Sequence, residues 1–321
     1  MAMEKYSGKQ IMTRIAAIDL GANTVRILIA EPEGEHFSIV YSDQVITRLS
    51  AGLGKSKKLD EAAMKRTVDG VAALLKNAES FLPFNLVIAA ASAGRNAVNS
   101  HELDVRLRSA VGYGLKVITW ETEARLALKG ARMVMEEDNN GFILFDIGGG
   151  STEFIHSKRK GKNAAVGTDL GVVRLSESYL SAHPVIDYEY RNMAEEVKAK
   201  VDQAFDQLAP DGRETIVGTA GTVTSMAAMD LELDEYNSAM INHHKLTLRA
   251  VEVMRLKLSM MTIPQMSRIG PLKGGREDLI IPGIAIVEAV MRRMGVDNLV
   301  VSDFGLREGL ILEMLEHGSI I

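Results

Sequence analysis

Residues 15–30, IAAIDLGANTVRILIA, and residues 142–155, FILFDIGGGSTEFI, carry the same pattern twice. Each begins with an apolar run that ends in Asp, an aliphatic residue and Gly, and continues through two small or polar residues and a hydroxyl residue into a second apolar run. This pattern predicts a strand, a tight glycine turn and a return strand. The two aspartates, Asp19 and Asp146, lie 127 residues apart, about the length of one domain. The repeat therefore predicts two duplicated domains that face each other across a cleft.

Strands and helices alternate along the rest of the chain. Short apolar runs predict further strands at residues 37–48, 86–91, 115–119, 215–218 and 298–301. Apolar residues at helical spacing predict helices at residues 59–81, 101–111, 121–135, 187–208, 221–230, 247–261, 283–294 and 305–316. The alternation indicates an α/β fold with mostly parallel sheets. We expect a first domain over residues 1–126 and a second over residues 127–321, with residues 1–12 as a disordered leader and a last helix that can pack back on the first domain.

The composition excludes several classes of protein. The 321 residues include 37 basic and 42 acidic ones, for a net charge of −5, so the chain as a whole has no nucleic-acid footprint. Cysteine is absent, which rules out disulfides, thiolate nucleophiles and zinc–thiolate sites. The first ten residues are polar and lack the apolar core of a signal peptide, and the first long apolar run contains Asp19, Asn23 and Arg26. We therefore expect a cytoplasmic protein with neither a nucleic-acid nor a membrane partner.

We call residues 21–24 the first clamp and residues 148–151 the second clamp, because each turn has the chemistry to hold a phosphate. Glycines let several backbone N–H groups approach one anion closely, and the hydroxyl residue of each turn adds a donor. The aspartate at the end of each preceding strand, Asp19 or Asp146, is suited to a hydrated Mg²⁺ ion that offsets phosphate charge. The predicted phosphate-binding residues of the clamps are Gly21, Asn23, Thr24, Gly148, Gly149, Gly150 and Ser151.

A third glycine turn follows the strand predicted at residues 215–218 and opens a helix, with Gly218, Thr219, Gly221 and Thr222 as candidate phosphate ligands. The N-terminus of a helix offers an anion several N–H groups without partners and a favourable dipole. A tight connection without a ligand is the alternative for such a turn, and its presence beside two clamps favours a phosphate site.

Charged residues near the clamps are further candidates. Glu153 lies seven residues after Asp146 in an apolar strand, where an acidic side chain is costly without a partner, so a metal or a water network is expected there. Arg95 follows a buried strand, and its guanidinium suits either a phosphate or a structural ion pair. Glu121 and Glu123 are two residues apart at the start of a helix, so at most one of them faces the cleft.

The order of these motifs resembles the Ppx/GppA family of exopolyphosphatases and guanosine pentaphosphate phosphohydrolases, within the acetate and sugar kinase/Hsp70/actin superfamily. The matching segments are AAIDLGANTVRIL, ASAGRNAVN, VITWETEARLAL, LFDIGGGSTEF, DLGVVRLSE, VGTAGTVTS, REDLIIPG and DFGLREGL, which together span nearly the whole chain. The resemblance implies two ribonuclease-H-like (actin-like) domains around a deep cleft. It also implies release of the terminal phosphate from polyphosphate with Mg²⁺, or alternatively Mn²⁺, and in some members conversion of pppGpp to ppGpp.

The resemblance also implies roles for individual residues. Glu123, in the segment ETEAR, falls on the position of the catalytic base. Asp146, Gly148 and Glu153 fall on clamp and metal positions, and Arg95 falls on a phosphate-binding arginine. The expected partners are polyphosphate, or guanosine penta- and tetraphosphate, and a second copy of the chain in a homodimer.

Departures from the family pattern concern the first clamp and the C-terminus. Ala22 and Ala91 stand where the family often has hydroxyl residues, so the first clamp offers fewer donors. We also expect a compact two-domain form without the helical C-terminal extension of longer relatives.

Two other functions share the clamps. An actin-like kinase or ATPase is one alternative, and a non-catalytic sensor of (p)ppGpp or polyphosphate is the other. Glu123 favours the hydrolase, because a water nucleophile needs a base whereas a kinase needs an acceptor pocket.

Overall fold

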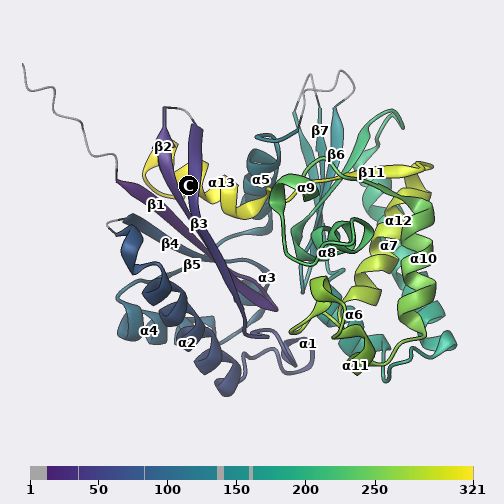
Figure 1. Cartoon of the computed structure of the whole chain (residues 1–321), viewed down its shortest axis with the longest axis horizontal. Helices are drawn as coiled ribbons and strands as arrows, with labels where there is room; N and C mark the ends of the chain where they lie inside the picture. The colour runs from purple at the N-terminus through teal and green to yellow at the C-terminus, as the bar shows by residue number, and fades with distance from the viewer. Residues whose placement is uncertain (1–12, 35, 83, 136–140, 159–161, 321) are drawn as a thin grey trace, which may run out of the picture.

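The computed structural model describes residues 13–34, 36–82, 84–135, 141–158 and 162–320, and Figure 1 shows two sheets side by side. The first sheet has the order β3-β2-β1-β4-β5, with β1 (Arg14–Leu20), β2 (Thr24–Glu33), β3 (His36–Ile46), β4 (Phe84–Ala90) and β5 (Leu115–Val117). The second sheet has the order β10-β11-β9-β6-β7-β8, with β6 (Phe142–Ile147), β7 (Thr152–Ser157), β8 (Ala164–Thr168), β9 (Thr215–Thr219), β10 (Lys245–Thr247) and β11 (Asn298–Val301). The leader expected at residues 1–12 lies outside the described residues.

The repeat in the sequence is also a repeat in the fold. In each sheet a glycine turn joins an antiparallel pair, β1 with β2 and β6 with β7, and a later strand lies parallel to the first, β4 beside β1 and β9 beside β6. The expected two-domain α/β architecture is thereby confirmed. The expectation of mostly parallel sheets is wrong: each glycine turn reverses the chain, and the outer strands β3, β8 and β10 also pair antiparallel.

Helices cover both sheets. The longer ones are α2 (Glu61–Asn77), α4 (Ser100–Val111), α5 (Trp120–Ala131), α6 (Val172–Tyr179), α7 (Asp187–Leu208), α8 (Ala220–Asp230), α10 (Leu248–Ser259), α12 (Ile280–Met294) and α13 (Leu306–His317). The short ones are α1 (Leu53–Ser56), α3 (Ser92–Asn96), α9 (Ser238–Ile241) and α11 (Ile263–Met266), with 3₁₀ turns at Glu79–Phe81 and Gly270–Leu272. Apolar residues of α2 and α4 pack against the first sheet, and those of α7, α8 and α12 pack against the second. Within the described part of the chain, no helix combines the length and apolarity needed to cross a bilayer.

The two halves meet where α5 crosses α13. Helix α5 packs against β6, β7 and β9, whereas α13 packs against β1 and β2 (Figure 1). The helices approach so closely that a Cβ on Gly130 would lie 2.0 Å from the Gly305 carbonyl oxygen, and one on Gly309 would lie 2.0 Å from the Leu126 oxygen. Glycine is therefore required on both helices, and the C-terminal helix is built into the first half of the molecule.

Candidate active site

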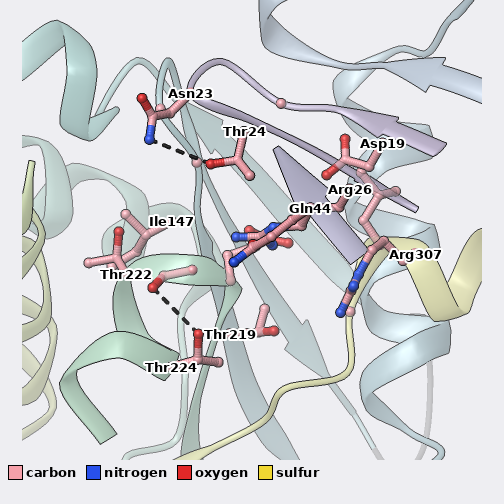
Figure 2. A pocket seen from close by; sticks show the side chains of 18 of the residues that line it. Asp19, Asn23, Thr24, Arg26, Gln44, Ile147, Thr219, Thr222, Thr224 and Arg307 are labelled. Atoms are coloured by element: carbon pink, nitrogen blue, oxygen red, sulfur yellow. Dashed lines mark hydrogen bonds between the residues drawn. The ribbon is translucent and has the colours of Figure 1, made fainter. Parts of the chain in front are cut away.

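The glycine turns of both halves open into one cleft of about 520 Å³. Figure 2 shows that side chains from both sheets enter it: Asn23 and Thr24 lie on one side, and Thr219 and Thr222 lie on the other. The predicted site residues that line the cleft are Asp19, Gly21, Asn23, Thr24, Glu123, Asp146, Gly148, Gly149, Gly150, Ser151, Thr219, Gly221 and Thr222. Three predicted residues, all within the described part of the chain, do not line it: Arg95, Glu153 and Gly218.

The first clamp is a tight turn. The N–H of Gly21 donates to the Thr24 carbonyl at 3.1 Å, and a Cβ on Gly21 would lie 2.8 Å from that oxygen, so only glycine fits. The side-chain amide of Asn23 donates to the Gly275 carbonyl of the other half at 3.0 Å. Asn23 thus contributes an interdomain contact in this arrangement, in addition to the phosphate-binding role predicted for it.

The second clamp repeats this turn and faces the first. The N–H of Gly148 donates to the Ser151 carbonyl at 2.9 Å. A Cβ on Gly149 would lie 2.4 Å from the Cβ of Ala22, and one on Gly150 would lie 2.3 Å from Ser92 Oγ. The glycines of the second clamp therefore allow the two turns to meet closely across the cleft.

Some residues of the third turn lie in the core and others line the cleft. Gly218 lies in β9, where a Cβ would lie 2.8 Å from Phe145 and 2.9 Å from Val223. Close packing of α8 on the sheet explains this glycine, in place of the predicted phosphate contact. Thr219 donates its hydroxyl to the Phe304 carbonyl at 3.1 Å, and Gly221, in the first turn of α8, lines the cleft.

Three carboxylates, those of Glu123, Asp146 and Glu153, gather near the second clamp, and the charge of Asp19 reaches Asp146 from the first half. Asp146 and Glu153 are cross-strand partners in β6 and β7, so their side chains share one face of the sheet. Glu123 accepts a hydrogen bond from Arg95 Nη1 at 2.7 Å, while Arg95 Nη2 lies 3.7 Å from Glu153 Oε1. We expected at most one of Glu121 and Glu123 to face the cleft. Glu123 is 8% exposed and lines the cleft, whereas Glu121 is exposed to solvent.

Burial and mutual repulsion make these carboxylates difficult to ionise. Burial, followed by the charges of Glu123 and Asp19, raises the pKa of Asp146 to about 7. Burial likewise raises the pKa of Asp19, and it raises the pKa of Glu123 against the opposing effect of Arg95. The pKa of Glu153 is raised well above its ordinary value, first by burial and then by Glu123 and Asp146. This end of the cleft therefore favours a bound cation.

Arg26, Arg276 and Arg307 line the same cleft, and no role was predicted for them from the sequence. The charge of Arg26 opposes the rise in the pKa of both Asp19 and Asp146, so arginines and carboxylates are neighbours in this cleft. Arg276 donates to the Gly221 carbonyl at 3.0 Å and to Ser225 Oγ at 2.5 Å, and burial followed by repulsion from Arg26 lowers its pKa to about 10. Arg307 donates to Ser42 Oγ at 3.2 Å, and Figure 2 shows Arg26 and Arg307 in the same pocket as Asp19. These arginines are suited to bind anions.

The signals for these arginines were present in the sequence. Arg276 and Arg307 fall in the segments REDLIIPG and DFGLREGL. Arg26 is the cross-strand partner of Asp19, so its side chain shares the face of the sheet that carries that carboxylate. Periodicity alone could not show that Arg276, in a loop, meets Arg26, in a strand 250 residues earlier in the sequence, at one cleft.

Paired glycine turns, buried carboxylates and arginines lie in one cleft between the two similar halves of an α/β protein, and this combination has the chemistry of a site for a phosphate compound with its counterion. The chain belongs to the Ppx/GppA phosphatase family, whose sequence profile matches residues 28–317. It is therefore an enzyme of the phosphatase class, as the sequence predicted.

Named relatives cover nearly the whole chain. Exopolyphosphatase 2 of Mycobacterium tuberculosis is 30% identical over 321 residues, which cover 94% of this chain and 99% of that protein. The guanosine-5'-triphosphate,3'-diphosphate pyrophosphatase of Vibrio atlanticus is 25% identical over 305 residues, covering 94% of this chain and 59% of that protein. The crystal structure of the Aquifex aeolicus Ppx/GppA family member has a TM-score of 0.78 at 26% identity, and the match covers 95% of this chain and 98% of that one.

Proposed function

We propose that this protein is an exopolyphosphatase that hydrolyses the terminal phosphoanhydride bond of polyphosphate and releases orthophosphate. The observation that carries the proposal is the meeting of two glycine clamps from different domains beside a cluster of buried carboxylates. The clamps provide N–H donors for a phosphate, and the carboxylates provide a base and cation ligands. The names of the relatives add pppGpp as a second substrate class, converted to ppGpp.

We assign the general base to Glu123. A base is most effective when its pKa lies near the working pH, and burial raises the pKa of Glu123 from its ordinary value. The bond from Arg95 fixes the direction of the carboxylate. Glu123 would accept a proton from the attacking water while the clamps hold the terminal phosphate.

A divalent cation fits the same end of the cleft. Glu153 Oε1 and Ser151 Oγ are buried and have no hydrogen-bond partner among the described residues, and oxygen atoms are the ligands that Mg²⁺ and Mn²⁺ prefer. Within the described residues, no three of the cleft carboxylates bring oxygens within 4.8 Å of one another. We propose that Asp146, Glu153 and Asp19 hold the ion together with several waters. When bound, the cation would offset the charge of the phosphate oxygens.

We also propose the organisation that the sequence suggested: domains over residues 1–126 and 127–321, a homodimer, and a cytoplasmic location. The separate core of each sheet supports the two domains. Size-exclusion chromatography with light scattering tests the dimer.

The decisive experiment measures orthophosphate released from polyphosphate with Mg²⁺ and no nucleotide. The exopolyphosphatase releases phosphate under these conditions. A kinase or ATPase would require a nucleotide, and a sensor would bind polyphosphate without hydrolysing it. No release from polyphosphate together with release from pppGpp would restrict the function to the second substrate class.

A further inference from the structure

Side chains of the two halves also meet on the side of the molecule away from the α5–α13 crossing. Figure 1 shows α5 and α13 at the top, and α1 and α6 at the bottom. Next to α6, Arg48 donates two hydrogen bonds to the Asp278 carboxylate, at 3.0 and 3.1 Å. Nearby, the N–H of Gly52 donates to Glu177 Oε1 at 2.9 Å. We call the Arg48–Asp278 pair the clasp.

On the side of the first domain, the clasp is joined directly to the first clamp. The N–H groups of Thr47 and Arg48 donate to the Asn23 carbonyl at 3.0 and 2.9 Å, and the N–H of Ser50 donates to the Ala22 carbonyl at 2.9 Å. Arg48 has a φ of 49°, a conformation that a residue with a side chain adopts only when its surroundings hold it there. The position of Arg48 therefore sets the position of the turn that faces the phosphate.

On the side of the second domain, one short segment carries both the clasp and cleft residues. The Gly275 carbonyl accepts the Asn23 amide, Arg276 points into the cleft, and Asp278 holds Arg48. Ser176 Oγ donates to the Asp278 carbonyl at 2.9 Å and anchors the segment to α6. A movement of this segment would displace Arg276 and the partner of Asn23 together.

We propose that the Arg48–Asp278 clasp holds the two domains closed around the substrate and thereby positions the first clamp, and that it opens when substrate enters or orthophosphate leaves. The side chains of the pair are 46% and 30% exposed, so water and salt weaken their attraction. Such a pair changes an equilibrium by only about two- to fivefold, which favours closure without preventing opening at each turnover. The kinetic consequences of this inference rest on the proposed function.

The kinetic test compares Arg48→Ala, Asp278→Asn and the double variant with Arg108→Ala, using polyphosphate and Mg²⁺. Arg108 makes a 3.0 Å ion pair with Asp104 inside one helix. This pair is the matched control, because it does not connect the two domains. We expect each clasp variant to raise KM about two- to fivefold with kcat unchanged or higher, and the double variant to match the single ones. The exchanged pair, Arg48→Asp with Asp278→Arg, should bring KM back toward the wild-type value, and Arg108→Ala should leave it unchanged.

A second measurement does not depend on catalysis. The chain has no cysteine, so Lys76→Cys on α2 and Lys257→Cys on α10 allow a donor and an acceptor dye to report the distance between the halves. Asp278→Asn should shift the energy transfer toward the open arrangement, whereas Arg108→Ala should not. If phosphate release fails altogether, this shift still supports the clasp. Unchanged energy transfer in Asp278→Asn, additive effects in the double variant, or a kcat loss as large as the KM change would each overturn the proposal.

Discussion

Replacement of Glu123 by Gln is the sharpest test of the proposed chemistry. The substitution keeps the size of the side chain and an oxygen that can accept the 2.7 Å bond from Arg95 Nη1, but it removes the ability to take a proton. General-base catalysis contributes about 10²- to 10⁴-fold. We expect kcat for polyphosphate to fall by a factor in this range.

The structure also predicts the effect on folding. Glu123 is 8% exposed, and its charge raises the pKa values of Asp146 and Glu153. Loss of that charge relieves repulsion within the cluster while the bond to Arg95 weakens. The two effects oppose each other, so the unfolding midpoint in urea should change little.

The assay is steady-state phosphate release, with polyphosphate binding and urea unfolding measured on the same preparations. Glu121→Gln is the internal control, because Glu121 lies two residues away on the same helix and is exposed. It should retain wild-type kcat. If the two variants lose similar activity, or if Glu123→Gln stays within a few-fold of wild type, the base is not Glu123, and Asp19, Asp146 and Glu153 become the candidates.

Three further predictions concern the metal, an arginine and the helix crossing. Exhaustive chelation should abolish phosphate release and added Mg²⁺ or Mn²⁺ should restore it; full activity after chelation would contradict the metal assignment. Because Arg95 bonds to Glu123, Arg95→Ala should lower kcat by about 10²-fold with a smaller rise in KM, whereas a rise in KM alone would assign Arg95 to phosphate binding. Hydrogen bonds from Arg125 and then Lys129, acting against burial, lower the pKa of Glu313 to about 2. The ionised carboxylate therefore stabilises the folded state above the pKa of the unfolded chain, about 4.3, and this stabilisation is lost as the pH falls toward 2. Glu313→Gln should therefore cost about 1–2 kcal/mol in urea unfolding at pH 7, and the difference from wild type should shrink between pH 5 and pH 2; a constant difference would argue against the ion pair.

The sequence predicted most accurately those parts of the fold that depend on local signals. Each glycine turn is dictated by a close approach to the carbonyl three residues on, so the Asp-x-Gly pattern located both hairpins and most of the cleft residues. Short elements carried too few residues for a periodic signal: β8, α6 and the three-residue strand β10 were not predicted. The direction of many strands was mispredicted. The alternation of strands with helices along the sequence indicates parallel strands joined by helices, but it does not reveal the hairpins, whose strands pair antiparallel.

Contacts between distant segments account for what the sequence did not reveal in the site. Gly218 and Gly221 belong to the same glycine turn of the sequence. Gly218 packs under α8 whereas Gly221 lines the cleft, and only the three-dimensional structure distinguishes the two positions. Arg276 reaches Gln44 on β3 from the other half of the molecule, at 3.3 Å. A charged residue in a loop has no periodicity, so its role depends on the partner that the fold brings to it.

The charges of the cleft indicate why one ligand should bind to both its carboxylates and its arginines. The carboxylates raise each other's pKa, and Arg26 helps lower the pKa of Arg276, although Arg26 also offsets part of the charge of Asp19 and Asp146. A cation alone would relieve only the repulsion among the carboxylates, and a phosphate alone would relieve only the repulsion among the arginines. A polyphosphate terminus that carries a divalent ion brings opposite charge to both groups at once, and the repulsion that it relieves contributes to its binding free energy. The same pairing explains how a chain with a net charge of −5 can bind a polyanion: the attraction is confined to a few arginines and backbone N–H groups that the fold collects in one place.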